Sequence, residues 1–92
     1  PLGIPFNIAS YAILLHLLAR EVNMVPNKLG FSGGDCHIYT NQIDSVREQL
    51  TRETFDLCRI ELSNKSINEL EFDDIKILDY KSSDVIKFKL SN

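Results

Sequence analysis

Several residue types that mark special classes of small protein are scarce in this sequence. Its 92 residues include no tryptophan, one methionine, two cysteines, three prolines and four glycines. Cys36 and Cys58 form no Cys-x-x-Cys pair, which excludes a disulfide-rich scaffold and a zinc site of the usual spacing. We therefore expect reduced thiols, no metal, and a cytoplasmic protein (in the host cytoplasm if the source is viral).

Clustered positive charge and a membrane-length apolar run are also missing. The net charge is −3, and lysines and arginines are scattered singly, so we expect neither a nucleic-acid partner nor a polybasic membrane patch. The most apolar run, residues 8–19, is too short to span a bilayer, and no charged segment precedes it as in a signal peptide. Gly33-Gly34-Asp35 lacks the Gly-Lys-Ser/Thr ending of a phosphate-binding loop.

What remains fits one small domain. A chain of this length buries only about 60–65% of the surface that its unfolded form exposes, so its core must be modest. The sequence starts at Pro1 without an initiator methionine. This start suggests a trimmed chain, a fragment or a processed product.

The clearest expected element is a helix of about 15 residues after Asn7. Asn7 is a good N-cap, Asn23 suits a left-handed residue after the helix, and Pro26 blocks its continuation. Apolar side chains surround this helix on all sides: Ile8, Tyr11, Ala12, Ile13, Leu14, Leu15, Leu17 and Leu18. Such a helix belongs inside a larger body, so we expect an N-terminal part, a partner subunit or both to cover it.

The rest of the chain predicts strands and a second helix. A strand is expected over residues 29–40, where Gly33 and Gly34 suggest a bulge or a close backbone approach. Asn41 is expected to cap the second helix, with Asp44 in a weak capping box. Alternating apolar residues predict half-buried strands in three further places: 58–62, 75–78 and 86–90. The expected fold class is α+β, with a long buried apolar helix packed on a mixed or antiparallel sheet and a second short helix.

Two groups of polar residues are candidates for binding. Asp35, His37 and Tyr39 are spaced by two, so on an extended segment they share one face, where they either line a polar pocket or satisfy buried backbone groups. His37 and Tyr39 can each donate or accept, as a sugar hydroxyl requires. The amide of Asn7 matches the O4 acceptor and N3–H donor of uracil, although helix capping alone is the simpler explanation.

The order of motifs along the chain resembles one enzyme family. Residues 2–19, LGIPFNIASYAILLHLLA, resemble the segment LGxPFNIASYALLxxxxA of thymidylate synthases. The run GGDCHIYTNQID resembles the G-D-x-H-x-Y-x-N-H of that family, and REQLTRE resembles the helix end that follows. The match is collinear over essentially the whole chain. It implies that residues 1–92 are the C-terminal part of a single thymidylate synthase-like domain.

The resemblance also implies an activity and roles for particular residues. The family methylates deoxyuridylate to thymidylate, with 5,10-methylenetetrahydrofolate as both carbon donor and reductant. By match, Asn7 would bind the pyrimidine edge, and His37 and Tyr39 would bind the deoxyribose 3′-hydroxyl. His16 matches no ligand position and is expected to be a packed histidine. The residues that would contact the folate are Leu2, Gly3, Phe6 and Leu90, the last in a tail that closes over the ligands.

The bond-making residues of the family lie upstream of the matched segment. The nucleophilic cysteine sits in a Pro-Cys motif and an Arg-Ser pair holds phosphate, and neither motif occurs here. Cys36 and Cys58 match positions that the family fills with small or aliphatic residues. We therefore expect residues 1–92 alone to be inactive. The family is dimeric, so the full-length protein is expected to be a homodimer.

Departures from the family pattern leave two alternatives open. Gln42 stands where the family usually has His, and residues 54–57 and 81–84 replace proline-containing segments. One alternative is part of a deoxyuridylate hydroxymethylase, which transfers the carbon unit without reduction. The other is a truncated, non-catalytic module that binds another chain. Asn7 argues against a cytosine substrate, because an acidic side chain would better accept from the cytosine amine.

Overall fold

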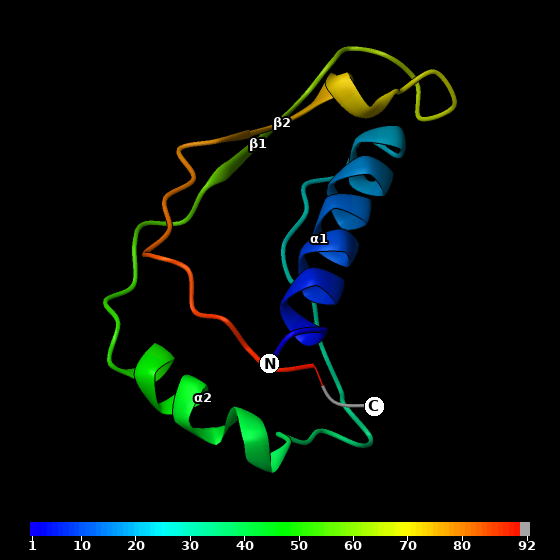
Figure 1. Ribbon diagram of the computed structural model, residues 1–92. Helices are drawn as coiled ribbons and strands as arrows, with labels where there is room; N and C mark the ends of the chain where they lie inside the picture. The colour runs from blue at the N-terminus through cyan, green and yellow to red at the C-terminus, as the bar shows by residue number, and fades with distance from the viewer. Residues whose placement is uncertain (91–92) are drawn as a thin grey trace.

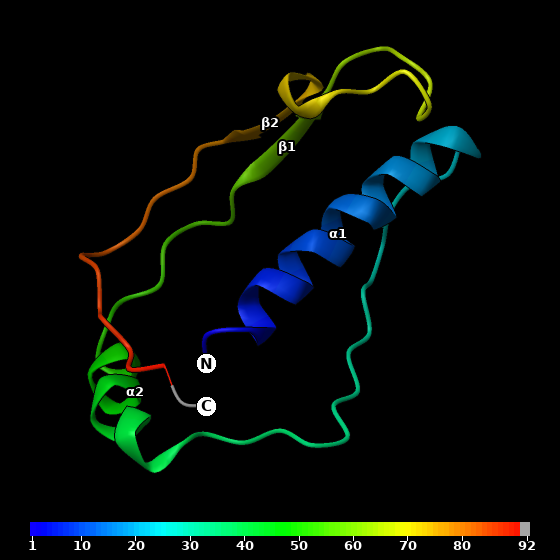
Figure 2. The ribbon, with the colours of Figure 1, turned by 45° about the vertical axis from the view of Figure 1, so that its right-hand side comes forward.

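The computed structural model describes residues 1–90 of the chain. Its elements follow one another around an open ring, with helix α1 (Ile4–Glu21) on one side (Figure 1). Strands β1 (Arg59–Leu62) and β2 (Ile75–Leu78) form a hairpin near the C-terminal end of α1, and helix α2 (Ile43–Leu50) lies toward its other end (Figure 2). The α+β class is therefore confirmed, with an antiparallel strand pair and a second short helix.

Helix α1 begins earlier than the sequence predicts. Gly3 is its N-cap, and Pro5 lies in the first turn, where a missing N–H costs no hydrogen bond. The N–H of Asn7 donates to the Gly3 carbonyl at 3.1 Å. The prediction that Asn7 caps the helix was wrong, because the proline lets the helix form upstream of it. The end of the helix is as predicted, since Asn23 has a φ of 56°.

The described residues leave most of α1 uncovered. Ala19 is buried, whereas Phe6, Tyr11 and Leu18 are 79%, 61% and 51% exposed. The predicted burial of this helix on a sheet is therefore not found within residues 1–90. The reason is geometric, since four-residue strands span about 13 Å and an 18-residue helix about 27 Å. Large apolar side chains of α1 therefore stay exposed among the described residues.

The two strands confirm two of the four predicted ones. They pair antiparallel, with Ile60 opposite Ile77 and Glu61 opposite Lys76. The predicted strands over residues 29–40 and 86–90 were wrong, since neither segment has a ladder partner in the described part of the chain. Alternating apolar residues favour an extended backbone, but a strand also needs a second backbone beside it.

Polar contacts attach the C-terminal end of α1 to the loop after β1. The guanidinium of Arg20 donates to the carbonyls of Ser63 and Lys65, the latter at 2.6 Å. The carboxylate of Glu21 accepts from the N–H of Ile67, also at 2.6 Å. The last two residues of α1 thus hold the hairpin loop.

A 3-10 turn, η2 (Phe72–Asp74), leads from that loop into β2. Glu71 and Asp74 close it with a reciprocal capping box. The N–H of Glu71, followed by the side chains of Ser63 and Lys65, lowers the pKa of Asp74 from 3.8 to about 2. Asp74 is therefore a second polar anchor at the hairpin end.

A second 3-10 turn, η1 (Thr40–Gln42), precedes α2. Asn41 lies inside this turn, so the prediction that it caps the helix was wrong. The Glu48–Arg52 pair one helical turn apart forms with an N–O distance of 3.1 Å. No helix within residues 1–90 is long and apolar enough to cross a membrane.

Candidate functional site

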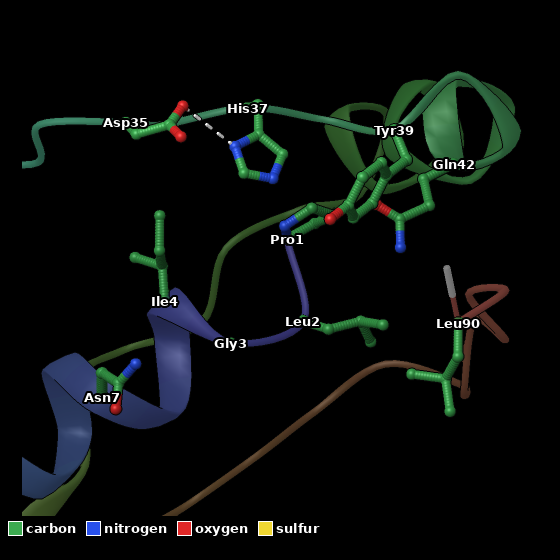
Figure 3. A pocket seen from close by; sticks show the side chains of 10 residues that line it. All are labelled: Pro1, Leu2, Gly3, Ile4, Asn7, Asp35, His37, Tyr39, Gln42 and Leu90. Atoms are coloured by element: carbon green, nitrogen blue, oxygen red, sulfur yellow. Dashed lines mark hydrogen bonds and ion pairs between the residues drawn. The ribbon is translucent and has the colours of Figure 1, made fainter. Parts of the chain in front are cut away.

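A cavity of about 330 Å³ lies where the start of α1, the segment before α2 and the C-terminal segment meet (Figure 3). Its size is at the lower end of the range for small-molecule sites. Six of the seven predicted ligand-binding residues line it: Leu2, Gly3, Asn7, His37, Tyr39 and Leu90. These residues come from three parts of the sequence, so the fold brings them together.

Phe6 is the predicted residue that this cavity does not include. It lines a neighbouring, more open hollow of about 790 Å³, together with Ile86 and Phe88 of the C-terminal segment. Leu2 lines both spaces. The cavity and the hollow therefore adjoin at the residues just before α1.

The Asp35, His37 and Tyr39 side chains lie on one side of their segment, as their spacing predicts (Figure 3). Nδ1 of His37 is 3.3 Å from Oδ1 of Asp35, and the His37 and Tyr39 rings meet edge to face with centroids 5.0 Å apart. The Asp35 and His37 side chains are 94% and 51% exposed. They therefore line the cavity rather than satisfy buried backbone groups. A proton on Nδ1 directed at Asp35 leaves Nε2 of His37 as an acceptor.

Asn7 faces the cavity with its amide uncommitted. No side chain caps α1, and within residues 1–90 the Asn7 amide forms no hydrogen bond. Capping, the simpler explanation from sequence, does not account for this residue. Its carbonyl acceptor and its NH₂ donor are both available to a ligand.

At the paired glycines, the atoms that lie close to Gly33 belong to side chains and not to the backbone that the sequence predicts. A Cβ there would collide with Sγ of Cys36 and lie 3.1 Å from the ring of Phe31. A larger residue at position 33 would therefore have to displace the Cys36 and Phe31 side chains. Cys36 and Cys58 are free and exposed, and the cavity lining includes neither of them.

Gln42 is a lining residue that the sequence reasoning did not assign to the site. It is 3% exposed, and its Nε2 donates to the carbonyl of Lys89 at 2.8 Å. Its Oε1 is buried and has no hydrogen-bond partner among the described residues. The signal in the sequence was its replacement of the histidine of the family pattern.

The arrangement suits binding more than bond making. Amide, imidazole and phenol groups of the lining supply donors and acceptors, and Leu2, Ile4 and Leu90 supply apolar surface. Among residues 1–90, no group of His, Cys, Asp and Glu side chains could hold a metal ion. Neither cysteine is placed to act as a nucleophile on a ligand in this cavity.

Comparison with known proteins gives the chain its relatives. The sequence model of the thymidylate synthase family matches residues 1–92. A thymidylate synthase of Francisella philomiragia is 44% identical over 92 residues, which cover 98% of this chain and 34% of that protein. A thymidylate synthase of Mycoplasma pneumoniae is 46% identical over 87 residues, covering 94% of this chain and 30% of that protein. The chain spans about a third of the length of these curated relatives.

The fold and these matches define an α+β chain from an enzyme family. The chain belongs to the thymidylate synthase family. The resemblance of its two motifs to that family is confirmed.

Proposed function

We propose that residues 1–92 are the C-terminal part of a single thymidylate synthase-like domain that methylates deoxyuridylate with 5,10-methylenetetrahydrofolate. The observation that carries this proposal is the convergence of Asn7, His37 and Tyr39 on one cavity, with the Asn7 amide uncommitted. In this proposal the chain supplies contacts to both ligands and not the nucleophile.

The nucleotide half of the proposal rests on hydrogen-bond matching. The NH₂ of Asn7 donates to O4 of uracil, and its carbonyl accepts from N3–H. His37 and Tyr39, whose rings lie edge to face, hold the deoxyribose 3′-hydroxyl between them. Asp35 fixes the His37 ring through the 3.3 Å contact at Nδ1.

The folate half rests on the apolar residues of the cavity lining. Leu2 and Leu90 offer side chains against which a flat ring packs, and a Cβ at Gly3 would meet nothing within 4 Å, so the backbone there is open to a ligand. Phe6 borders the adjoining hollow that shares Leu2. A folate with its ring in the cavity and its longer part along the hollow contacts all four residues. The proposed site uses no metal.

Activity requires more than this chain. Neither Cys36 nor Cys58 lines the cavity, so in the proposed enzyme the nucleophile comes from residues outside this chain. The exposed apolar surface of α1 is where the rest of the domain packs in the proposed enzyme. We expect the complete protein to be a homodimer, and light scattering at micromolar concentration would contradict this expectation with a monomeric mass.

Tritium release tests the proposed function. The complete natural polypeptide that contains these residues should release tritium from 5-tritiated deoxyuridylate when methylenetetrahydrofolate is present, with thymidylate as the product. Residues 1–92 alone should release none, and tritium release by this piece would contradict the proposal that the nucleophile lies outside it. Release of tritium with 5-hydroxymethyl-deoxyuridylate as the product would establish the hydroxymethylase instead. No binding of deoxyuridylate by the complete polypeptide would favour the non-catalytic module.

A further inference from the structure

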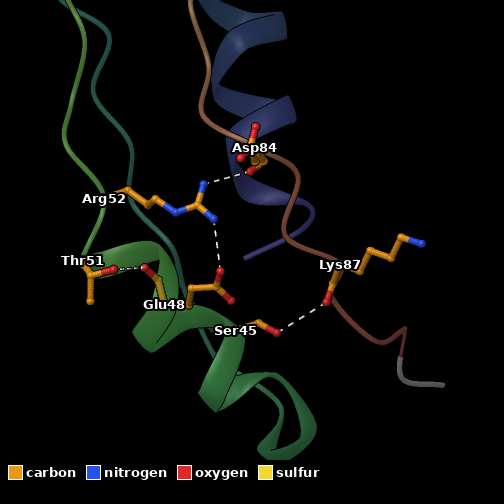
Figure 4. Close-up of polar contacts among 6 residues, drawn as sticks. All are labelled: Ser45, Glu48, Thr51, Arg52, Asp84 and Lys87. Atoms are coloured by element: carbon orange, nitrogen blue, oxygen red, sulfur yellow. Dashed lines mark hydrogen bonds and ion pairs between the residues drawn. The ribbon is translucent and has the colours of Figure 1, made fainter.

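The C-terminal segment, residues 84–90, runs along α2 and is held by its backbone carbonyls. Three side chains of η1, α2 and the residues just after it donate to these carbonyls, and Figure 4 shows two of them, those of Ser45 and Arg52. The three pairs are Gln42 to Lys89 at 2.8 Å, Ser45 to Lys87 at 3.4 Å, and Arg52 to Asp84 at 2.9 Å. The order of the donors is opposite to that of the acceptors, so the segment lies antiparallel to the helix.

The spacing of the three contacts fits a specific register. At the rise of an α-helix, the ten positions from Gln42 to Arg52, which include the eight residues of α2, span about 15 Å, and five residues of extended chain span about 17 Å. Donors at 42, 45 and 52 therefore meet acceptors at 89, 87 and 84 without a bulge. The contacts position the segment along its length and bring Leu90 to the cavity.

Gln42 differs from the other two donors in its surroundings. It is 3% exposed and lines the cavity, whereas the contacts of Ser45 with Lys87 and of Arg52 with Asp84 are on the surface. The carbonyl that it holds belongs to Lys89, which is adjacent to Leu90. Its Oε1 is buried with no partner among the described residues. A buried acceptor without a donor is unfavourable. A ligand donor that reaches Oε1 therefore stabilises the Gln42 side chain in the orientation that holds the Lys89 carbonyl.

We propose that Gln42 is a positioning residue that couples ligand binding to the docking of the C-terminal segment. One end of its amide, Nε2, holds the Lys89 carbonyl, and the other end, Oε1, accepts a hydrogen bond from an N–H or O–H of the ligand. Each contact fixes the amide in the orientation that the other needs. This inference rests on the proposed function, because it takes the occupant of the cavity to be deoxyuridylate with a folate.

Limited trypsin digestion of the complete natural polypeptide tests the coupling. Trypsin cleaves after Lys87 and Lys89 when the segment is released. Deoxyuridylate with tetrahydrofolate, which carries no methylene group and cannot react, should slow this cleavage about tenfold or more in the wild type. In Gln42→Met the ligands should slow it less than twofold. Gln42→His should restore the protection, because a neutral imidazole also combines one donor with one acceptor.

Ser45→Ala is the matched control, because it also removes a contact between α2 and the segment but not one at the cavity. It should raise cleavage equally with and without ligands and leave their ratio unchanged. Circular dichroism of each variant verifies that it is folded. If Gln42→Met does not fold, Gln42→Glu replaces it, since it keeps the shape and an acceptor but loses the donor to Lys89, and it too should lose the protection.

Two results would overturn the inference. One is ligand protection in Gln42→Met or Gln42→Glu equal to that of the wild type. The other is loss of protection in Gln42→His as complete as in Gln42→Met. Calorimetry of the wild type separates these results from a failure of the proposed function, which would appear as no binding of deoxyuridylate at all.

Discussion

The polar side chains at the two ends of α1 differ in whether they form hydrogen bonds within the described residues. At the C-terminal end, Arg20 and Glu21 are bound to the loop after β1 and Ala19 is buried. At the N-terminal end, the Asn7 amide has no hydrogen-bond partner within residues 1–90, and Phe6 is exposed. The polar groups at the C-terminal end hold the hairpin loop to the helix, and the Asn7 amide at the N-terminal end is available to a ligand.

This contrast separates stability from binding within a single helix. A polar group that is already paired in the fold gains little by meeting a ligand, because it must first give up its partner. Asn7 has no such partner to give up. We therefore expect substitutions at the hairpin end to change stability, and substitutions at the cavity end to change ligand affinity.

The largest expected effect is at Arg20. Arg20→Ala removes charged donors from the carbonyls of Ser63 and Lys65, and each such bond contributes about 1.5–3 kcal/mol. We expect the free energy of unfolding of the complete polypeptide, measured in urea, to fall by roughly 3 kcal/mol. Arg47→Ala is the control, because Arg47 is 76% exposed and pairs with Asp44 on the surface. It should change stability by less than about 0.5 kcal/mol. Equal losses in the two variants would contradict the division.

A smaller effect is expected at Tyr39. In the proposed site, Tyr39→Phe removes one neutral hydrogen bond to the 3′-hydroxyl, and such a bond contributes about 1 kcal/mol or a fivefold change in affinity. Calorimetry should show weaker binding of deoxyuridylate and unchanged binding of 2′,3′-dideoxyuridylate, which has no such hydroxyl. Tyr11→Phe changes the same group outside the cavity and should change neither affinity. A loss with both ligands would show that the phenol acts on the fold instead.

The smallest effect is a pH dependence at Asp74. Its pKa in the folded state is about 2, below its ordinary 3.8. Because the folded value is the lower one, the stabilisation is fully present above about pH 4 and is lost as the pH falls through 2. The difference in unfolding free energy between wild type and Asp74→Asn should therefore shrink from pH 4 to pH 2. Asp44→Asn, at a fully exposed side chain, should show no such change. A difference in unfolding free energy between wild type and Asp74→Asn that stays constant from pH 4 to pH 2 would refute the prediction.

The parts of the fold that the sequence predicts are set by short-range patterns. Asn23 takes a left-handed conformation because of its own side chain, and β1 and β2 follow from alternating residues near a turn. The motif residues Asn7, His37 and Tyr39 were found by their resemblance to a family, and the fold then brought them to one cavity.

The parts that failed depend on partners far along the chain. Residues 29–40 and 86–90 have the composition of strands, but no second backbone lies beside them in the described structure. Gln42 could not be assigned to the site because its partner, Lys89, is 47 positions away. The start of α1 differs from the prediction for a local reason, since Pro5 is tolerated in the first turn and the helix begins upstream of Asn7.

The most direct test of the account is the base preference of Asn7→Asp. The affinities of deoxyuridylate and deoxycytidylate are measured by calorimetry on the complete polypeptide, with Asn27→Asp as a control that adds the same charge outside the cavity. A carboxylate can accept from the cytosine amine but cannot donate to O4 of uracil, and such a pair is worth about 1–3 kcal/mol of discrimination. The account predicts a shift of roughly 10- to 100-fold toward deoxycytidylate in Asn7→Asp and none in Asn27→Asp. An unchanged ratio in folded Asn7→Asp would contradict it.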